Sequence, residues 1–234
     1  MTASSPFQDA PVPEENTWSE GRARTLRVVP DHVRRVRPYE RWVKRGFDFV
    51  GGLVLLVLLS PVLMVTAIAV RIRLGSPVFF KQVRIGQDGE PFEVLKFRSM
   101  RQDRRQHGGQ FSGHDRRRVH KTNDDPRHTS LGRRIRKTSL DELPQLLNVV
   151  RGEMSLVGPR PELAHIAEQH DLVDHPRHQV RPGMTGLWQV SPDRQGMLYE
   201  NVDKDLEYVE HITLVGDVKI LFRTLGAVGR GSGS

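Results

Sequence analysis

The apolar residues of the chain are concentrated in one uncharged run over residues 49–70. As a single straight helix this run would be about 33 Å long, enough to cross a hydrocarbon core of about 30 Å. Ser60 and Pro61 lie in its middle. A proline in a helix interior removes one backbone hydrogen bond and costs about 3 kcal/mol. We therefore expect a break at this point, with Ser60 as a partner for the freed carbonyl in lipid.

Basic residues flank the apolar run at both ends. Lys44 and Arg45 precede it, and Arg71 and Arg73 follow it. A helix that simply crosses a bilayer usually has its basic residues on one side. The pattern favours a re-entrant segment that enters the membrane, bends, and leaves on the same face, and a spanning helix is the alternative.

Beyond this run, the alternation of polar and apolar positions predicts a small α+β domain. Residues 77–83 and 92–97 are typical of short strands, and residues 86–89 between them have the composition of a turn. Apolar residues near the C-terminus recur at helical spacing. The predicted organisation is a re-entrant helix-break-helix hairpin (41–74), a mostly helical domain with a short β-hairpin (75–228), and a flexible tail (229–234).

Residues 1–40 show no apolar periodicity, contain several prolines, and predict a disordered arm. Basic residues are dense over residues 22–45, and the whole chain has 36 Lys and Arg against 28 Asp and Glu, a net charge of +8. Such a charge favours anionic partners. Because the basic segment lies next to an apolar run, we favour an arm that lies on an anionic membrane face, and a solvated tail is the alternative. Aromatic residues make up only 6%, which disfavours nucleic-acid binding. The absence of cysteine excludes disulfides and cysteine nucleophiles.

The candidate chemistry lies at two adjacent carboxylates, Asp141 and Glu142, within a cation-rich stretch. A capping box with Ser139 as the N-cap would explain Glu142, but Pro144 would then fall beyond the first helical turn. A helix that starts at Asp141 tolerates Pro144 and places Asp141 where the helix dipole favours a carboxylate and a bound phosphate. A plain aspartate cap and a catalytic aspartate both remain open.

In the catalytic interpretation, an ionised carboxylate attacks phosphorus and forms an acyl phosphate. Adjacent acids repel each other, so keeping both ionised requires arginines or a metal ion, and oxygen ligands beside phosphate indicate Mg²⁺. The turn at residues 158–162 has Pro159 and Pro161 on either side of Arg160, which fixes this arginine for a phosphate. The alternative is a surface turn with a salt bridge between Arg160 and Glu162.

An ordered set of sequence blocks resembles the bacterial sugar transferases, the monotopic polyprenyl-phosphate phosphoglycosyl transferases. The resemblance covers about residues 41–226. The matching blocks are residues 44–48, 60–61, 75–86, 96–100, 125–127, 139–145, 155–162 and 181–190. One block would be weak evidence, but the ordered set is specific. The chain departs from the family at residues 191–194, Ser-Pro-Asp-Arg, which affects the loop on the acceptor or sugar side.

The resemblance implies a cytoplasmic catalytic domain on the inner leaflet of the bacterial cytoplasmic membrane. Asp141 matches the family's nucleophile and Glu142 its partner, both associated with Mg²⁺. The implied reaction moves a sugar-1-phosphate from a UDP-sugar to polyprenyl (undecaprenyl) phosphate and releases UMP, as the first membrane step of a surface glycan. Arg160 matches a phosphate-binding arginine. Further matching positions that line the site are Lys96, Arg98, Asp125, Arg127 and Arg181.

Several properties stay open at this point. The resemblance leaves the sugar, the length of the polyprenyl chain and the oligomeric state undetermined, and a homo-oligomer is compatible with it. Residues 1–40 cannot supply the extra N-terminal membrane helices of many relatives, so we expect the minimal form of the family. The competing hypothesis is a non-catalytic membrane scaffold that holds partners through its basic arm.

Overall fold

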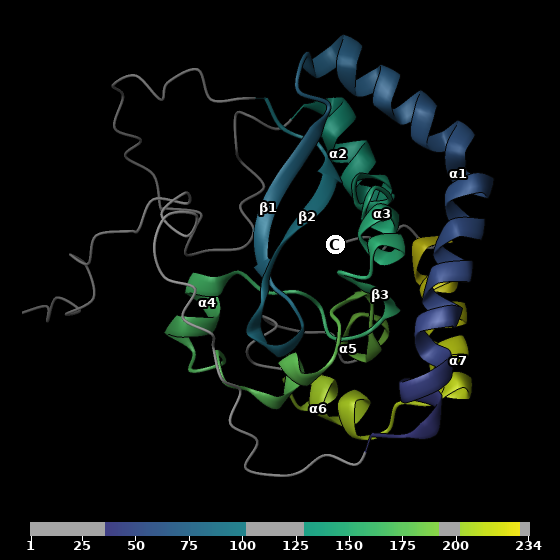
Figure 1. The fold of residues 1–234 in the computed structure, drawn as a ribbon. Helices are drawn as coiled ribbons and strands as arrows, with labels where there is room; N and C mark the ends of the chain where they lie inside the picture. Colours follow the sequence, from purple (N-terminus) through teal and green to yellow (C-terminus); the bar gives the residue numbers. More distant parts are fainter. Residues whose placement is uncertain (1–35, 102–128, 192–201, 230–234) are drawn as a thin grey trace, which may run out of the picture.

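A computed structural model describes residues 36–101, 129–191 and 202–229. These residues form an α+β fold that is mostly helical, with one β-hairpin and one long helix, α1, along its edge (Figure 1). The α+β class and the hairpin are confirmed. Almost all of the predicted arm, the position of Arg127 and the block at 192–194 lie outside the described residues.

The helix α1 runs from Lys44 to Leu74, directly after a short π-helical turn, η2 (Tyr39–Val43). Pro61 lies inside it, and its missing N–H leaves the carbonyl of Val57 without the usual helical donor. The Ser60 hydroxyl donates to that carbonyl at 2.8 Å, as predicted. The structure therefore does not show the predicted helix-break-helix hairpin: α1 continues through Pro61 and changes direction along its length, so that its second half lies over α2 (Ser130–Lys137; Figure 1).

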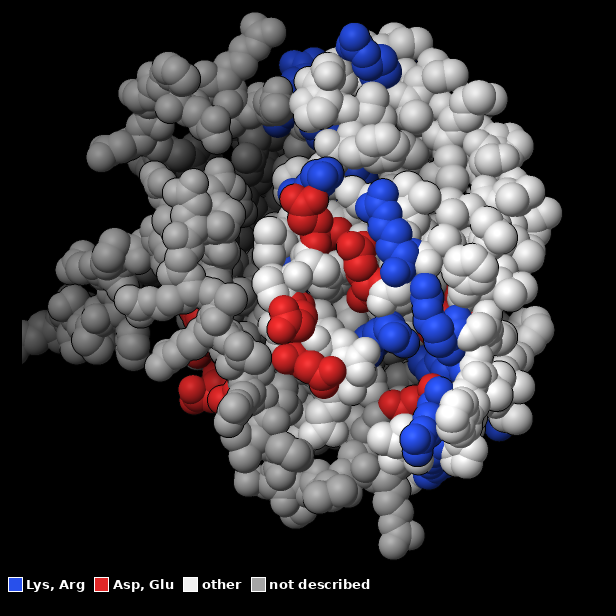
Figure 2. All heavy atoms as spheres, viewed as in Figure 1, with Lys and Arg blue, Asp and Glu red and all other residues white. Residues whose placement is uncertain are grey.

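Among the described residues, η2 and α1 together form the one helix that is long and apolar enough, by length and composition alone, to cross a membrane. Many of its apolar side chains have no protein neighbours to cover them, and Val57 and Leu58 are 65% and 68% exposed. In Figure 2 the edge along which α1 runs is largely white, whereas charged side chains gather on the face beside it.

Two glycines allow α1 to lie close to the rest of the protein. A Cβ atom at Gly51 would lie 2.8 Å from Leu156 Cδ1, and one at Gly52 would lie 3.1 Å from Val149 Cγ1. These contacts bring α1 against α3 (Gln145–Arg151) and β3 (Ser155–Val157).

Polar contacts fix the first turns of α1 in the same position. Lys44 Nζ lies 2.7 Å from Asp217 Oδ2, and both side chains are buried. Arg45 donates from both terminal nitrogens, each at 2.8 Å, to the last carbonyls of α3. The carboxylate of Asp48 accepts from Ser155 Oγ and from the N–H of Leu156. The apolar helix and the domain are therefore joined by charged as well as apolar contacts.

The β-hairpin consists of β1 (Phe79–Ile85) and β2 (Pro91–Phe97), which pair antiparallel with Phe79 opposite Phe97. The turn η3 (Gln87–Gly89) between them needs two residues with positive φ, Asp88 at 54° and Gly89 at 82°. The predicted strands overlap the observed ones, with ends that differ by one or two residues.

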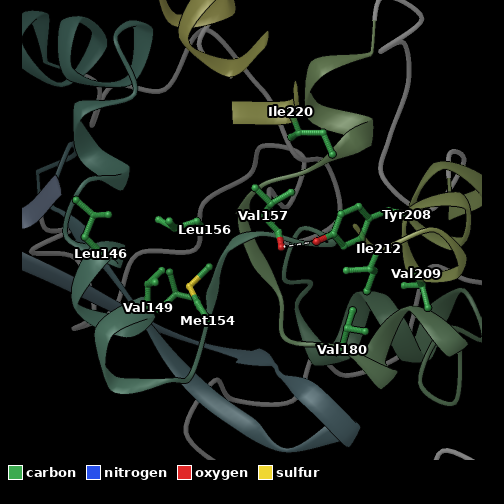
Figure 3. Close-up of a cluster of buried hydrophobic side chains, with 11 residues drawn as sticks. Leu146, Val149, Met154, Leu156, Val157, Val180, Tyr208, Val209, Ile212 and Ile220 are labelled. Carbon is green, nitrogen blue, oxygen red and sulfur yellow. Dashed lines mark hydrogen bonds between the residues drawn. The ribbon is translucent and has the colours of Figure 1, made fainter. Parts of the chain in front are cut away.

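The remaining elements complete the fold, in which the described buried apolar side chains form three clusters. They are η4 (Leu140–Glu142), α4 (Ala164–Gln169), η5 (Pro176–Gln179), β4 (Gly183–Thr185), α5 (Leu187–Val190), α6 (Val202–Glu210) and α7 (Leu214–Gly229). The short strands β3 and β4 pair in parallel. Figure 3 shows the core cluster, in which the Tyr208 hydroxyl donates to the Val157 carbonyl at 2.8 Å. The cluster is formed by Val94, Leu146, Val149, Met154, Leu156, Val157, Val180, Tyr208, Val209, Ile212 and Ile220.

Candidate active site

Asp141 and Glu142 lie on the 3-10 turn η4, between α2 and α3. Ser139 begins this turn in the left-handed conformation with φ 56°, and its side chain makes no capping hydrogen bond. The helix α3 begins only at Gln145, with Pro144 at its N-cap. The predicted helix start at Asp141 is therefore wrong, because hydrogen bonds of the 3-10 type, between residues i and i+3, continue past Pro144. Neither carboxylate caps a helix, so both capping explanations fail.

Glu142 is held by two cations from other parts of the fold. Its Oε1 atom lies 2.9 Å from Lys96 Nζ and 3.1 Å from Arg160 Nη2. Lys96 comes from β2, and Arg160 from the loop that follows β3. The fold thus brings Lys96 and Arg160, which are distant in the sequence, to the turn that carries Asp141 and Glu142.

The environment of Glu142 keeps it ionised. Burial acts to raise the pKa of this carboxyl, but the charges of Arg160 and Lys96 outweigh burial and hold the pKa at about 2. Burial also lowers the pKa of Lys96, and the negative charge of Glu142 opposes that shift. Glu142 is therefore an anion throughout the neutral range, with its charge committed to its two partners.

The pKa of Asp141 is shifted in the opposite direction. Burial, and then the charge of Glu142, raise the pKa of Asp141 to about 6, while Lys96 and Arg136 act to lower it. No cation of the described ranges lies within ion-pair distance of its carboxylate. Adjacent carboxyls with opposite pKa shifts are typical of sites in which the two groups perform different tasks. Sequence reasoning did not assign Arg136 to the site.

The loop at residues 158–162 is fastened through its backbone. Four successive carbonyls, from Pro159 to Glu162, each accept a hydrogen bond from outside the loop. The donors are the Gly183 N–H at 2.8 Å, the Arg177 guanidinium at 2.7 Å, the Arg84 guanidinium at 3.2 Å and the Ile85 N–H at 3.0 Å. The loop that carries Arg160 is therefore fixed along its length.

The alternative salt bridge between Arg160 and Glu162 does not form. Arg160 pairs with Glu142, and Glu162 lies 3.5 Å from Arg84 instead. Sequence reasoning missed both Arg84 and Arg177. Arg84 falls within a block that matches the family, whereas Arg177 lies in no recognised motif.

Comparison of the sequence with known proteins assigns the chain to a family. The sequence profile described as "Bacterial sugar transferase" matches residues 39–231. The chain belongs to the bacterial sugar transferase family. The family predicted from the ordered blocks is thus confirmed, and the protein is a transferase.

Relatives of this sugar transferase include proteins with and without additional length. It is 37% identical over 218 residues to the exopolysaccharide production protein ExoY of Sinorhizobium fredii, covering 91% of this chain and 96% of the relative. It is 39% identical over 206 residues to the UDP-glucose:undecaprenyl-phosphate glucose-1-phosphate transferase of Escherichia coli, covering 85% of this chain but 42% of the relative. The uncharacterized sugar transferase EpsL of Bacillus subtilis is 40% identical over 186 residues, which are 80% of this chain and 87% of that protein.

Two further predicted site residues of the sugar transferase, Arg98 and Arg181, form no ion pair with Asp141 or Glu142 in the part of the chain that the structure describes. Arg98 is buried and donates to the carbonyls of Leu74 and Ser76, at 2.9 Å for Ser76, so it caps the C-terminal end of α1. Arg181 is half-buried and lies two residues before the start of β4. Their proposed contacts with phosphate, and that of Arg127, stay predictions.

The described residues contain no cluster of three or more acidic or histidine side chains that could hold a metal ion. Mg²⁺ commonly takes one or two protein carboxylates together with substrate phosphates and water, so a full protein cage is not required. Asp141 and Glu142 supply oxygen donors only, and one Glu142 oxygen is already bound to Lys96 and Arg160. The donor set therefore fits Mg²⁺ that is shared with a phosphorylated substrate.

Proposed function

We propose that this protein transfers a sugar-1-phosphate from a UDP-sugar to polyprenyl phosphate and releases UMP. The observation that carries the proposal is the difference in electrostatic environment between the two adjacent carboxylates, Asp141 and Glu142. Glu142 is bound to two cations, whereas Asp141 has a carboxyl with a raised pKa and no cation within ion-pair distance among the described residues. The names of the relatives, which include a UDP-sugar and undecaprenyl phosphate, support this choice of donor and acceptor.

In the first step, an ionised oxygen of Asp141 attacks the β-phosphorus of the UDP-sugar. The bond from that phosphorus to the oxygen shared with the α-phosphate breaks, and UMP leaves with the bonding electrons. Lys96 and Arg160 are preorganised beside Glu142 and stabilise the negative charge that develops on the transferred phosphoryl group. The product is an aspartyl-phosphosugar on Asp141.

In the second step, a phosphate oxygen of the lipid attacks the same phosphorus. The acyl phosphate bond breaks, Asp141 returns to its carboxylate form, and a polyprenyl-diphosphate sugar is released. Mg²⁺, when bound by the two carboxylates and the substrate phosphates, would supply charge neutralisation. We expect removal of Mg²⁺ with a chelator to stop UMP release and its re-addition to restore it.

We propose that α1 is embedded in the inner leaflet as a re-entrant segment, with the catalytic domain on the cytoplasmic face. Its uncovered apolar side chains, its bend and the basic residues at both ends support this placement. Because the chain contains no cysteine, single cysteines placed at Arg41 and Ser76 can be labelled individually. A re-entrant segment places both on the cytoplasmic side, whereas a spanning helix exposes one on each side.

A labelling experiment tests the reaction directly. Purified protein in detergent is mixed with Mg²⁺ and a UDP-sugar that is radiolabelled in the sugar, drawn from a panel of such sugars, without lipid acceptor. We expect one equivalent of UMP and a labelled protein, and addition of polyprenyl phosphate should move the label to lipid. Absence of UMP release with every donor, with and without polyprenyl phosphate, would favour the non-catalytic scaffold.

A further inference from the structure

We propose that Arg177, held by Asp205, is a positioning residue that fixes the backbone of Arg160 in the active site. This inference rests on the proposed function of Arg160 in binding phosphate. Of the four donors that fasten the loop, Arg177 alone binds the carbonyl of Arg160 itself. It is also one of the most deeply buried side chains among the described residues.

One guanidinium connects α6 to the loop. Arg177 Nε and Nη2 lie 3.0 Å and 2.7 Å from the same oxygen of Asp205, and Nη2 also donates to the Arg160 carbonyl at 2.7 Å. The two charged side chains are 0% and 2% exposed. At the other end, the Arg160 side chain reaches Glu142 at 3.1 Å. A continuous chain of contacts therefore runs from Asp205 through Arg177 and Arg160 to the catalytic turn.

The stability of the fold alone does not account for this pair. The cost of removing two opposite charges from water can equal or exceed the gain from their attraction, and apolar residues of similar volume often give a protein that is as stable. A buried, charge-assisted arginine contact has a defined direction, however, because the guanidinium is planar and its donors are fixed. The pair is therefore suited to holding one carbonyl in place. The position of Arg160 matters, since a misplacement of about 1 Å at a catalytic group can reduce the rate roughly 100-fold.

A double-mutant cycle separates positioning from general stabilisation. Asp205→Asn removes the charge that orients Arg177 but keeps the shape of the side chain, and we expect kcat/KM for UMP release to fall roughly 10- to 100-fold. Arg160→Ala alone should lower kcat/KM by roughly 100-fold or more. In the Arg160→Ala background, Asp205→Asn should cost less than twofold, because the residue that it positions is absent. The proposal would be overturned if the loss of kcat/KM in the double variant equalled the product of the losses in the two single variants.

The control is a second buried ion pair of the same protein. Asp217 is 0% exposed and lies 2.7 Å from Lys44. We expect Asp217→Asn to lower the melting temperature, and its effect on kcat/KM to be the same with and without Arg160. If Asp205→Asn does not fold, Arg177→Lys serves in the same cycle, since lysine keeps the charge but lacks the fork that binds Asp205 and the carbonyl together. Loss of folded protein in both variants would assign the pair to folding and would also overturn the proposal.

The two proposals fail in different ways. If the wild-type protein releases no UMP, the proposed function is wrong. If it releases UMP and the losses from Asp205→Asn and Arg160→Ala multiply, only the positioning role is wrong.

Discussion

Two neighbouring acids on one turn have opposite electrostatic environments. Glu142 is anionic because two partly buried cations contact it, whereas Asp141 holds its proton more tightly than a free aspartate does. A carboxyl with a pKa near 6 is more nucleophilic than an ordinary aspartate when ionised and is still largely ionised at pH 7. This combination suits a nucleophile that must first attack and later leave.

The pKa of Asp141 predicts the pH dependence of the first half-reaction. Because the attacking form is the carboxylate, kcat/KM for UMP release should rise about tenfold per pH unit below a pKa of about 6 and level off above it. Arg136→Gln removes a cation that lowers this pKa and should move the midpoint to higher pH. Arg134→Gln, an exposed change on the same helix, is the matched control. A rate that is flat from pH 5 to pH 8 would contradict the assignment.

The same shifts predict stability changes of opposite sign for the two acids. The folded pKa of Asp141 lies above its unfolded value, so its ionised form destabilises the fold at pH 7, and Asp141→Asn should stabilise it by roughly 1–2 kcal/mol. The pKa of Glu142 is lower in the folded than in the unfolded protein, so its ionised carboxylate stabilises the fold at any pH above the unfolded pKa. This contribution is lost as the pH falls toward 2.

Glu142→Gln should destabilise the fold by roughly 2 kcal/mol, because it leaves Lys96 and Arg160 without their anion. Both variants should show little or no labelling by the sugar. Thermal unfolding in detergent at pH 7 measures the difference. A lower melting temperature for Asp141→Asn would show that its carboxylate has a stabilising partner.

At the scale of the element, α1 shows how a proline is accommodated without ending a helix. Ser60 supplies the donor that Pro61 lacks, so the segment bends and continues. The sequence predicted both the apolar segment and the function of Ser60. It could not predict whether the chain would separate into two helices, since that depends on how each half packs against the domain.

A cycle at residues 60 and 61 tests this compensation. Ser60→Ala leaves the Val57 carbonyl without a donor in apolar surroundings and should destabilise the protein in detergent by roughly 1–2 kcal/mol. In the Pro61→Ala background the backbone N–H is restored, so the same Ser60→Ala change should cost only a few tenths of a kcal/mol. Equal costs in the two backgrounds would exclude the proposed compensation.

Other elements show where prediction from sequence was less successful. The hairpin was predictable because polar and apolar residues alternate over two segments that enclose a turn. The parallel strands β3 and β4 are too short to show any periodicity, and the contacts of Lys96 and Arg160 with Glu142 join distant parts of the chain. The start of α3 was missed because the positive φ of Ser139 and the turn at Pro144 delay the helix.

At the scale of the whole molecule, the apolar helix and the turn that carries Asp141 and Glu142 share one packed unit. This turn lies just before α3, and α3 packs against Gly52 and accepts hydrogen bonds from Arg45. The apolar helix is therefore held against the domain by specific contacts. If α1 enters the lipid as proposed above, its docking sets where the site lies relative to the lipid.

Two glycines of α1 provide a matched test of this docking. Gly52→Leu inserts a side chain where even a Cβ would lie 3.1 Å from Val149, so we expect destabilisation by roughly 1–3 kcal/mol and a loss of UMP release. A Cβ added at Gly46 would meet no atom within 4 Å, and Gly46→Leu should leave both properties near wild type. Membrane association of both variants, measured by fractionation, should be unchanged. Equal effects at the two positions would show that the close approach at Gly52 is unimportant.

The rigid attachment of α1 has a kinetic consequence. If Asp141 stays at a fixed height above the headgroups, the enzyme meets its acceptor only by lateral diffusion within the same lipid layer. In mixed micelles, turnover should then follow the mole fraction of polyprenyl phosphate in the detergent and fall when more detergent is added at constant total acceptor. The concentration of polyprenyl phosphate within the lipid or detergent layer, and not its bulk concentration, would then govern the rate.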